Sequence, residues 1–296
     1  MKAFQAASVL AFVAQVLGHG YIYRVTSDNT VYPGYDIFID PALSPAPSRI
    51  AYGGGSTGPV FDATSAAMAC GAVHNPAPGF IAQARAGSNV TFHWSRWLYS
   101  HKGPITAWMA PYEGDVAAVD VKKLEFVKFA EEAIGADGVW GTVKLLDKTN
   151  GTWTATIPAD IKPGKYIIRH EIIALHFAVN TTHGFEWSPI SPQFYMTCFN
   201  FNITGSGTAT PKGHPFPGAY DVADPALHWN LSSPDPYPLA GPKVYVPSYK
   251  ADLVPNKLTT ISPTLDEAGD KAYYEAQYKT LEAQGGVTAY FDSIGG

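Results

Sequence analysis

Three short stretches of the chain carry side chains that could bind a metal ion or move a proton. His101 lies in the segment Ser100–Pro104, a polar break between two apolar runs. A histidine on such a loop can offer a ring nitrogen to a metal or act as an acid or base. Taken alone, such a residue is more often an ordinary surface or hydrogen-bonded histidine. Other motifs in the sequence are needed to show whether it has a chemical role.

The second stretch is Arg169–His176, with the sequence R-H-E-I-I-A-L-H. Ala174 stands where a zincin motif needs its second histidine, four residues after His170, so this is not that zinc site. In a strand, His170 and His176 would share a face, but six residues is too far along it for both to hold one ion easily.

The third stretch is Gln193–Tyr195. Side chains alternate across a strand, so the amide of Gln193 and the phenol of Tyr195 should lie side by side on one face. Such a pair could hydrogen-bond a reacting group, although a tyrosine in a β-sandwich core also commonly just packs and hydrogen-bonds.

The N-terminus adds a further candidate. Met1 and Lys2 give a positive start, Ala6–Leu17 is almost wholly apolar, and Gly18 is small enough for cleavage. We expect residues 1–18 to be a secretory signal peptide, the alternative being a buried N-terminal helix. Cleavage would make His19 the first residue, and its α-amine and Nδ1 could then chelate one metal. Any residue can follow a cleavage site, so His19 alone is weak support.

Export has two further consequences. In an oxidising compartment Cys70 and Cys198 are expected to be paired. Such a bridge would close a loop of 198−70 = 128 residues and stabilise the fold by about 5 kcal/mol. Five N-x-S/T sequons are glycosylation candidates: Asn89, Asn150, Asn180, Asn202 and Asn230.

The elements that must position these residues are mostly strands. Alternating or β-branched runs bounded by Gly, Pro and Asn predict strands at Val90–Trp94, Trp153–Ile157, Lys165–Leu175 and Phe194–Ile203. Helices are expected only at Leu124–Ala133 and Leu265–Ala283. This pattern is typical of an all-β protein, a β-sandwich with long loops.

Composition agrees with one such domain. The chain has 296 residues, with 20 Lys+Arg against 25 Asp+Glu, 28 Gly and 24 Pro. The net charge of −5 argues against a nucleic-acid partner, and no later run is apolar for long enough to cross a membrane. We expect a catalytic domain over residues 19–246. We expect residues 247–296 to be a Pro-rich C-terminal extension that could carry a short helix and has no carbohydrate-binding module.

Taken together, the motifs resemble a known family. They are S-H-K-G-P at 100–104, I-P-A-D-I-K-P-G-K-Y-I-I-R-H-E-I-I-A-L-H at 157–176 and Q-F-Y-M-T-C at 193–198, after a mature start at His19. In this order they resemble the fungal lytic polysaccharide monooxygenases of auxiliary activity family 9. The resemblance runs from His19 to about Tyr245, and it implies an immunoglobulin-like or fibronectin-III-like sandwich with a flat copper-bearing face.

The resemblance implies a role for each motif residue. His19 and His101 would form a histidine brace for one copper ion, with Tyr195 on the axial side. His176 and Gln193 would hydrogen-bond the oxygen species, and Cys70 and Cys198 would form the core disulfide. Tyr32 and Tyr245 would belong to the substrate-binding face, Tyr35 being an alternative to Tyr32.

These roles imply an oxidoreductase that is secreted and monomeric. It would cleave β-1,4-glycosidic bonds in cellulose or a related hemicellulose by hydroxylating C1 or C4, with O₂ or H₂O₂ and an external electron donor. Three nitrogens in a plane with a long axial contact also suit copper better than zinc, which prefers a tetrahedral set.

Two other functions stay open. A two-carboxylate hydrolase would need a partner for Glu171, the only carboxylate within a motif. A non-catalytic carbohydrate- or copper-binding sandwich would keep the metal ligands without turnover.

The chain also departs from the family pattern in two loops. The separation of 193−176 = 17 positions is longer than the family's usual one, and the insert holds His183, which could replace His176. A family disulfide after the His101 strand is absent, with Ala110–Glu113 in its place.

Overall fold

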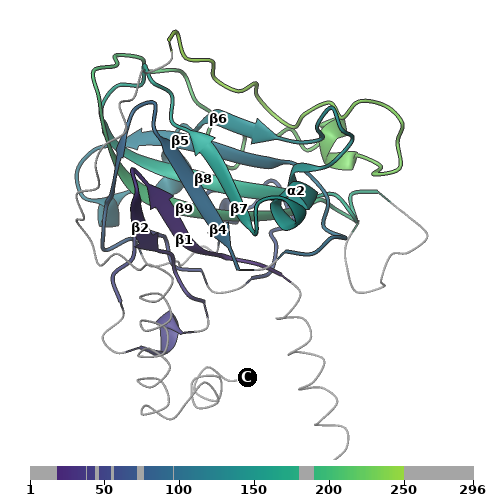
Figure 1. Cartoon of the computed structure of the whole chain (residues 1–296), viewed down its shortest axis with the longest axis horizontal. Coiled ribbons are helices and arrows are strands. Elements are labelled where there is room, and N and C mark those ends of the chain that lie inside the picture. Colours follow the sequence, from purple (N-terminus) through teal and green to yellow (C-terminus); the bar gives the residue numbers. More distant parts are fainter. Residues whose placement is uncertain are drawn as a thin grey trace, which may run out of the picture.

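The protein, described here by a computed structural model, is a sandwich of two β-sheets (Figure 1). One sheet has four strands in the order β2-β1-β4-β7, and the other has five in the order β3-β9-β8-β5-β6. The strands are β1 (Ile22–Ser27), β2 (Thr30–Pro33), β3 (Ala82–Arg85), β4 (Asn89–Trp94), β5 (Ile105–Tyr112), β6 (Val127–Glu132), β7 (Thr152–Thr156), β8 (Gly164–Ala174) and β9 (Gln193–Thr204). The predicted β-sandwich is therefore confirmed.

The structure describes residues 19–249, except 38, 44–46, 55–56, 72–76, 96 and 180–189. The signal peptide, His183, Asn180 and the helix expected at Leu265–Ala283 lie outside the described residues. Within those residues, no helix is both long and apolar enough to cross a membrane.

The long central strands β8 and β9 organise the core. They pair antiparallel in unbroken register from Gly164↔Ile203 to Ala174↔Gln193. Their apolar side chains are almost wholly buried, as expected for strands that are covered on both faces. All four strands predicted from periodicity are present within one or two residues of their expected bounds.

The prediction of a helix at Leu124–Ala133 is wrong. This region forms β6, which pairs antiparallel with β5 and places Lys128 opposite Trp108. The β-branched and aromatic residues of its first half fit an edge strand, and sheet pairing outweighs the weak helical preference of Ala and Glu. Among the described residues, the α-helix is α2 (Gly141–Asp147), and the short 3₁₀ helices are Asp40–Ala42, Ala66–Met68, Val116–Ala118, Val121–Lys123 and Pro225–His228.

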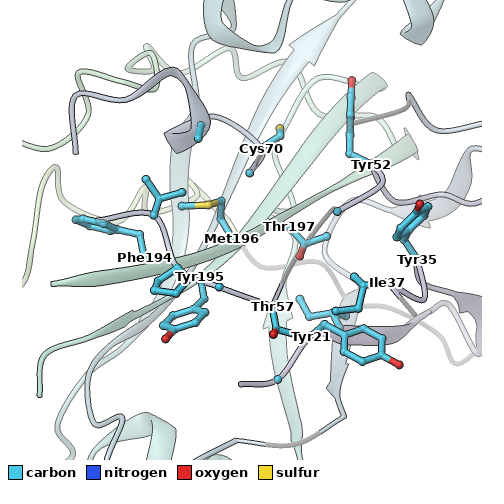
Figure 2. A pocket seen from close by; sticks show the side chains of 18 of the residues that line it. Tyr21, Tyr35, Ile37, Tyr52, Thr57, Cys70, Phe194, Tyr195, Met196 and Thr197 are labelled. Carbon is cyan, nitrogen blue, oxygen red and sulfur yellow. The ribbon is translucent and has the colours of Figure 1, made fainter. Parts of the chain in front are cut away.

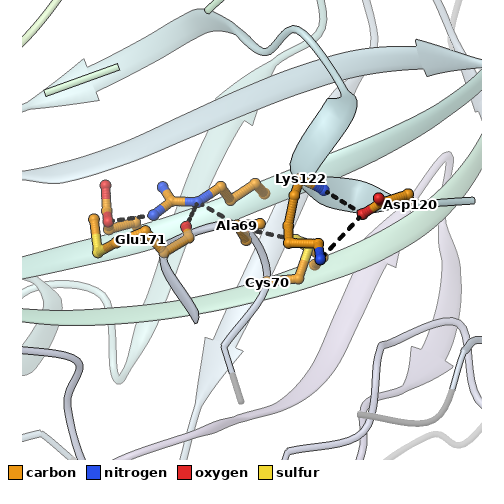
Figure 3. The surroundings of a disulfide bond; sticks show 8 residues. Ala69, Cys70, Asp120, Lys122 and Glu171 are labelled. Carbon is orange, nitrogen blue, oxygen red and sulfur yellow. Dashed lines mark hydrogen bonds and ion pairs between the residues drawn. A yellow bond between two sulfur atoms is a disulfide. The ribbon is translucent and has the colours of Figure 1, made fainter. Parts of the chain in front are cut away.

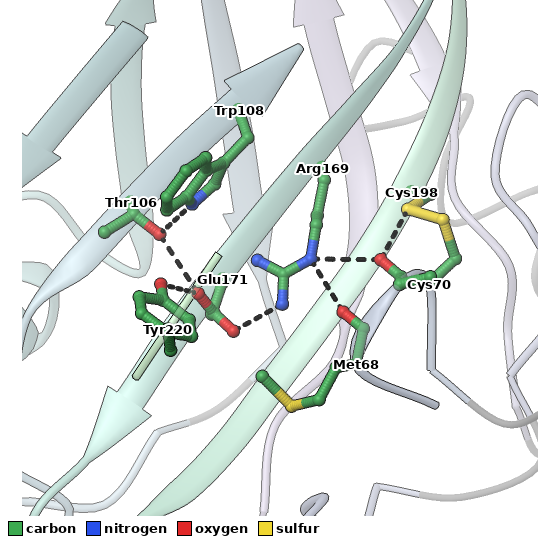
Figure 4. Close-up of polar contacts among 9 residues, drawn as sticks. Met68, Cys70, Thr106, Trp108, Arg169, Glu171, Cys198 and Tyr220 are labelled. Carbon is green, nitrogen blue, oxygen red and sulfur yellow. Dashed lines mark hydrogen bonds and ion pairs between the residues drawn. A yellow bond between two sulfur atoms is a disulfide. The ribbon is translucent and has the colours of Figure 1, made fainter. Parts of the chain in front are cut away.

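The middle of β8 explains why R-H-E can lie inside a strand. Period two sends His170 to the core between the sheets, and Arg169 and Glu171 to the opposite face. There Arg169 and Glu171 form an ion pair with both side chains 0% exposed. The Glu171 carboxylate also accepts a hydrogen bond from Tyr220, and Arg169 Nε donates to Met68 O and Ala69 O (Figure 4). The Glu171 carboxylate is therefore occupied by contacts that hold the fold together.

The segment after β9 is fastened over that same face. Besides the Tyr220 contact, Lys128 Nζ donates to Ala240 O at 2.6 Å, and Tyr245 N donates to Lys128 O at 2.7 Å. In Figure 1 this green segment passes over β6 at the top of the view.

The predicted pairing of Cys70 with Cys198 is confirmed, with a Cα–Cα distance of 5.2 Å (Figure 3). The bond joins the loop after the 3₁₀ helix Ala66–Met68 to the middle of β9. Arg169 and the disulfide therefore hold the same loop against the five-stranded sheet.

Candidate metal centre

The candidate residues come together at one end of the sandwich, where four chain segments meet. His19 precedes β1, His101 lies in the loop between β4 and β5, His176 lies two residues after the end of β8, and Gln193 begins β9. The loop pairs with the chain at the end of β8: Leu175 N donates to Lys102 O at 2.8 Å, and Ile173 N to Pro104 O at 3.1 Å.

Gly103 makes this pairing possible. A Cβ atom at this position would overlap the carbonyl oxygen of Ile173, so only glycine allows the two backbones to approach so closely. Because the loop lies against the end of β8, His101 and His176 are brought into contact.

The ring of His101 lies against those of Trp97, at a centroid distance of 5.8 Å, and of three candidate residues. Its centroid is 3.9 Å from that of His176, 5.1 Å from that of His19 and 6.2 Å from that of Tyr195. The rings of His19 and Tyr195 are 5.4 Å apart. Four residues spread over most of the chain length therefore surround one small volume.

The orientation of His101 is fixed on one side and open on the other. Its Nδ1 lies 2.9 Å from Ser100 Oγ, and its carbonyl oxygen accepts a hydrogen bond from Trp97 Nε1. Nε2 is buried and has no hydrogen-bond partner among the described residues. An unpartnered buried nitrogen is costly unless it has a ligand, so Nε2 fits a metal-binding role.

All three imidazoles are held neutral. Burial, together with the charges of His176 and His19, lowers the pKa of His101 to about 3. Burial and the charge of His19 lower the pKa of His176 to about 4, and burial also lowers the pKa of His19. Since only a neutral imidazole can ligate a metal, these rings need no deprotonation at neutral pH.

Tyr195 and Gln193 behave as the period-two pattern predicts. Both side chains are buried, and the Tyr195 hydroxyl donates to Gln193 Oε1 at 2.7 Å. Burial raises the pKa of Tyr195, so the phenol stays protonated. The centre thus combines neutral nitrogen donors with a protonated phenol and an amide.

The chemistry of this donor set fits a copper ion better than a harder cation. Two imidazoles and an amine would supply only nitrogen ligands, which copper binds most strongly among divalent metals. The α-amine would come from His19 once the preceding residues are removed, and the phenol would lie nearby.

A pocket of about 330 Å³ adjoins the centre, because Gly20, Trp94 and Tyr195 line it. Figure 2 shows Tyr195 and Tyr21 on one side of it, and Tyr52 and Cys70 on the other. The pocket therefore runs from the candidate centre to the loop that carries the disulfide.

Three residues singled out from the sequence lie away from the centre. Tyr32 is 7% exposed in the core, where its hydroxyl accepts a hydrogen bond from Gln83 N. The Tyr245 hydroxyl donates to Asp160, which precedes the start of β8, whereas His176 follows its other end, and the 11 residues of β8 alone span about 33 Å. His170 is fully buried between the sheets.

Two contributors were not identified from the sequence as functional residues. Trp97 is 4% exposed, donates to the His101 backbone and packs edge-on against Tyr195 with ring centroids 5.0 Å apart. Ser100 holds His101 Nδ1. Their position in the sequence could have identified them: both lie within four residues of His101, and adjacent Ser and His residues can form a direct hydrogen bond.

Comparison with known proteins gives the same family as the one that the sequence motifs resemble. Residues 19–238 match the family profile described as Auxiliary Activity family 9 (formerly GH61). A lytic polysaccharide monooxygenase B of this family from Geotrichum candidum is 36% identical over 90% of this chain and 74% of its own.

Two solved structures are also similar. The extended catalytic domain of LPMO9A from H. jecorina superposes with a TM-score of 0.69 at 29% identity, covering 83% of this chain and 97% of that one. A cellulose-active polysaccharide monooxygenase from M. thermophila gives 0.65 at 29% identity, covering 77% and 99%. The chain belongs to auxiliary activity family 9, a family of lytic polysaccharide monooxygenases, and is an oxidoreductase.

Proposed function

We propose that the protein is a secreted, copper-dependent monooxygenase that cleaves β-1,4-linked glucan such as cellulose. The observation that carries this proposal is the pair of facing imidazoles: His101 presents a buried, unpartnered Nε2, and the His19 ring lies 5.1 Å from the His101 ring. The α-amine and Nδ1 of a mature N-terminal His19, with Nε2 of His101, would hold one copper ion. Cellulose is favoured as substrate because the similar enzyme from M. thermophila is described as cellulose-active.

Copper held there would supply a one-electron redox couple for the activation of O₂ or H₂O₂. The overall reaction with O₂ takes one C–H bond, two electrons from an external donor and two protons, and gives one alcohol and one water. With H₂O₂ the same alcohol and water form without further electrons. Hydroxylation at C1 or C4 destabilises the neighbouring glycosidic bond, which then breaks by elimination.

The chain's own groups would orient and protect this chemistry. His176 packs against His101, and as a neutral imidazole it can donate one N–H hydrogen bond into the site. Gln193 Oε1 accepts from Tyr195, so the phenol is held in one position, and its raised pKa keeps it protonated. The Tyr195 ring lies 5.4 Å from the His19 ring, so its phenol would lie beside a copper ion held by the two histidines.

The N-terminal amine gives the sharpest test of this proposal. A protein beginning at His19 should bind one Cu(II) tightly and release oxidised oligosaccharides from swollen cellulose when ascorbate is added. The matched variant carries one additional methionine before His19, which removes the chelating amine and leaves every side chain in place. We expect its Cu(II) affinity to fall by more than a hundredfold in calorimetry, because one ligand and a chelate ring are lost.

His101→Ala should abolish oxidised products in the same assay. If the protein beginning at His19 binds copper but gives no oxidised products with either oxidant, the non-catalytic alternative holds. If the methionine-extended protein binds and reacts as well as the parent, the amine is not a ligand and the proposed site is wrong.

A further inference from the structure

The turn that carries His101 also presents an exposed aromatic ring. His101 N donates to Leu98 O at 3.0 Å, which closes a tight turn with Tyr99 and Ser100 at its tip. The turn is fixed from inside, because Trp97 Nε1 donates to His101 O and Ser100 Oγ lies 2.9 Å from His101 Nδ1. Tyr99 is nevertheless 58% exposed.

The Tyr99 ring has a partner on a separate element. Its hydroxyl donates to the carboxylate of Asp147, the last residue of α2. α2 is attached to the same loop, since Gly103 N donates to Thr142 Oγ1 at 3.1 Å. The ring is therefore held through its hydroxyl to a helix that is itself fastened to the loop after His101.

Helix stability does not account for this arrangement. A carboxylate at the C-terminal end of a helix lies next to the partial negative charge of that end, which is mildly unfavourable. An aromatic side chain that is left 58% exposed likewise gains less free energy of folding than a buried one.

The position of the pair matches the substrate that the proposed function requires. Tyr99 is two residues from His101, so their Cα atoms are at most about 7 Å apart. The axial C–H groups of a β-linked sugar ring form an apolar face that can stack on an aromatic ring, and a carboxylate can accept hydrogen bonds from sugar hydroxyls.

We propose that Tyr99 and Asp147 form a glycan-binding subsite beside the metal centre, with the ring stacking on one sugar unit and the carboxylate accepting its hydroxyls. This inference rests on the proposed function, because it needs a β-1,4-glucan bound across His101. The subsite determines where along the chain the substrate is held and contributes affinity, and it takes no part in holding the metal.

The test compares the copper-loaded parent with Tyr99→Ala, Tyr99→Phe and Asp147→Asn, using soluble cellohexaose as the ligand in calorimetry. Phe80→Ala is the matched control, because Phe80 is also exposed, at 61%, and its backbone contacts Arg49 and Asn200 far from the centre. We expect Tyr99→Ala to weaken cellohexaose binding about tenfold, the loss of one well-stacked anchor, and Phe80→Ala to leave it unchanged. Tyr99→Phe, which keeps the ring and loses the bond to Asp147, should fall between them.

Cu(II) affinity and the Cu(II) electron paramagnetic resonance spectrum should be the same in all five proteins, which separates a lost subsite from a damaged metal centre. Cellohexaose affinity in Tyr99→Ala equal to that of the parent would overturn the subsite and leave the proposed function standing. A parent that binds no cellohexaose and oxidises no cellulose would overturn the proposed function, and the subsite with it.

Discussion

At the scale of single residues, the candidate centre depends on side chains whose pKa values are shifted by burial, so that each keeps one protonation state near neutral pH. His101 and His176 are neutral well below pH 6.5 because burial, and the charge of the neighbouring His19, lower the pKa of both. Tyr195 is kept protonated by the same burial. Ligand nitrogens and a neutral phenol are therefore available without any proton having to leave first.

Part of this site follows from the sequence. Gln193 and Tyr195 could be placed side by side because the period of a strand is two, and the structure has them hydrogen-bonded. His101 could be placed on a loop, but its burial could not be predicted, because that depends on Gly103 lying against Ile173 about seventy residues later. Contacts of this kind are set by tertiary packing and leave no periodic signal.

His170 allows a prediction about pH. Burial lowers its pKa to about 3 in the folded protein, whereas an unfolded chain has the ordinary value near 6.5. Because the folded pKa is depressed, the stabilising effect is complete above pH 6.5 and is lost as the pH falls toward 3. Between pH 7 and pH 5 this residue should reduce the free energy of unfolding by about 2 kcal/mol.

His170→Gln removes the titration and keeps an acceptor for Trp94 Nε1, which donates to His170 Nε2 at 3.1 Å. Urea unfolding in EDTA should show that the variant loses about 2 kcal/mol less than the parent between pH 7 and pH 5. The control Trp94→Phe keeps the imidazole and should keep most of the parent's pH dependence. Equal pH dependence in His170→Gln and the parent would contradict this account.

At the scale of elements, β8 serves two layers at once. Its His170 face packs between the sheets, while Arg169 and Glu171 point to the loop at Met68–Cys70 and to the segment after β9. β8 could be predicted from its apolar run, but the buried ion pair and the edge strand β6 could not. Both depend on a partner segment that covers them, and composition alone favoured a helix at β6.

The Tyr220 hydroxyl gives a prediction for this element. Tyr220→Phe deletes the hydrogen bond to the fully buried Glu171 and leaves a carboxylate with fewer partners. The free energy of unfolding should fall by about 1–3 kcal/mol. The matched control is Tyr249→Phe, a 47% exposed side chain whose hydroxyl donates to Ala159 O, and it should cost less than about 0.5 kcal/mol. Urea unfolding of both variants at neutral pH is the measurement, and equal losses would show that the Glu171 network carries no special weight.

At the scale of the whole molecule, the disulfide covalently joins two segments that are far apart in the sequence. The Cys70–Cys198 bond spans 128 residues and ties the loop after Ala66–Met68 to β9. Its existence could be predicted from export and a count of two cysteines, whereas its place beside Arg169 required the fold.

Removing the disulfide by Cys70→Ser together with Cys198→Ser should lower the free energy of unfolding by up to about 5 kcal/mol, because the unfolded chain regains the entropy of a long loop. Thermal or urea unfolding measures this loss. Thiol titration of the denatured parent is the control and should find no free thiol; two reactive thiols would contradict the pairing.

The wide separation of the metal-centre residues has a consequence for how the protein is made. His19 and Tyr195 are 195−19 = 176 positions apart, and His101 lies between them. A centre of such high contact order forms only after both sheets have assembled, since loop closure over these distances comes late in folding. Tight metal binding would then serve as a readout of completed folding, absent from any chain in which the segments carrying His19, His101 and Tyr195 have not yet come together.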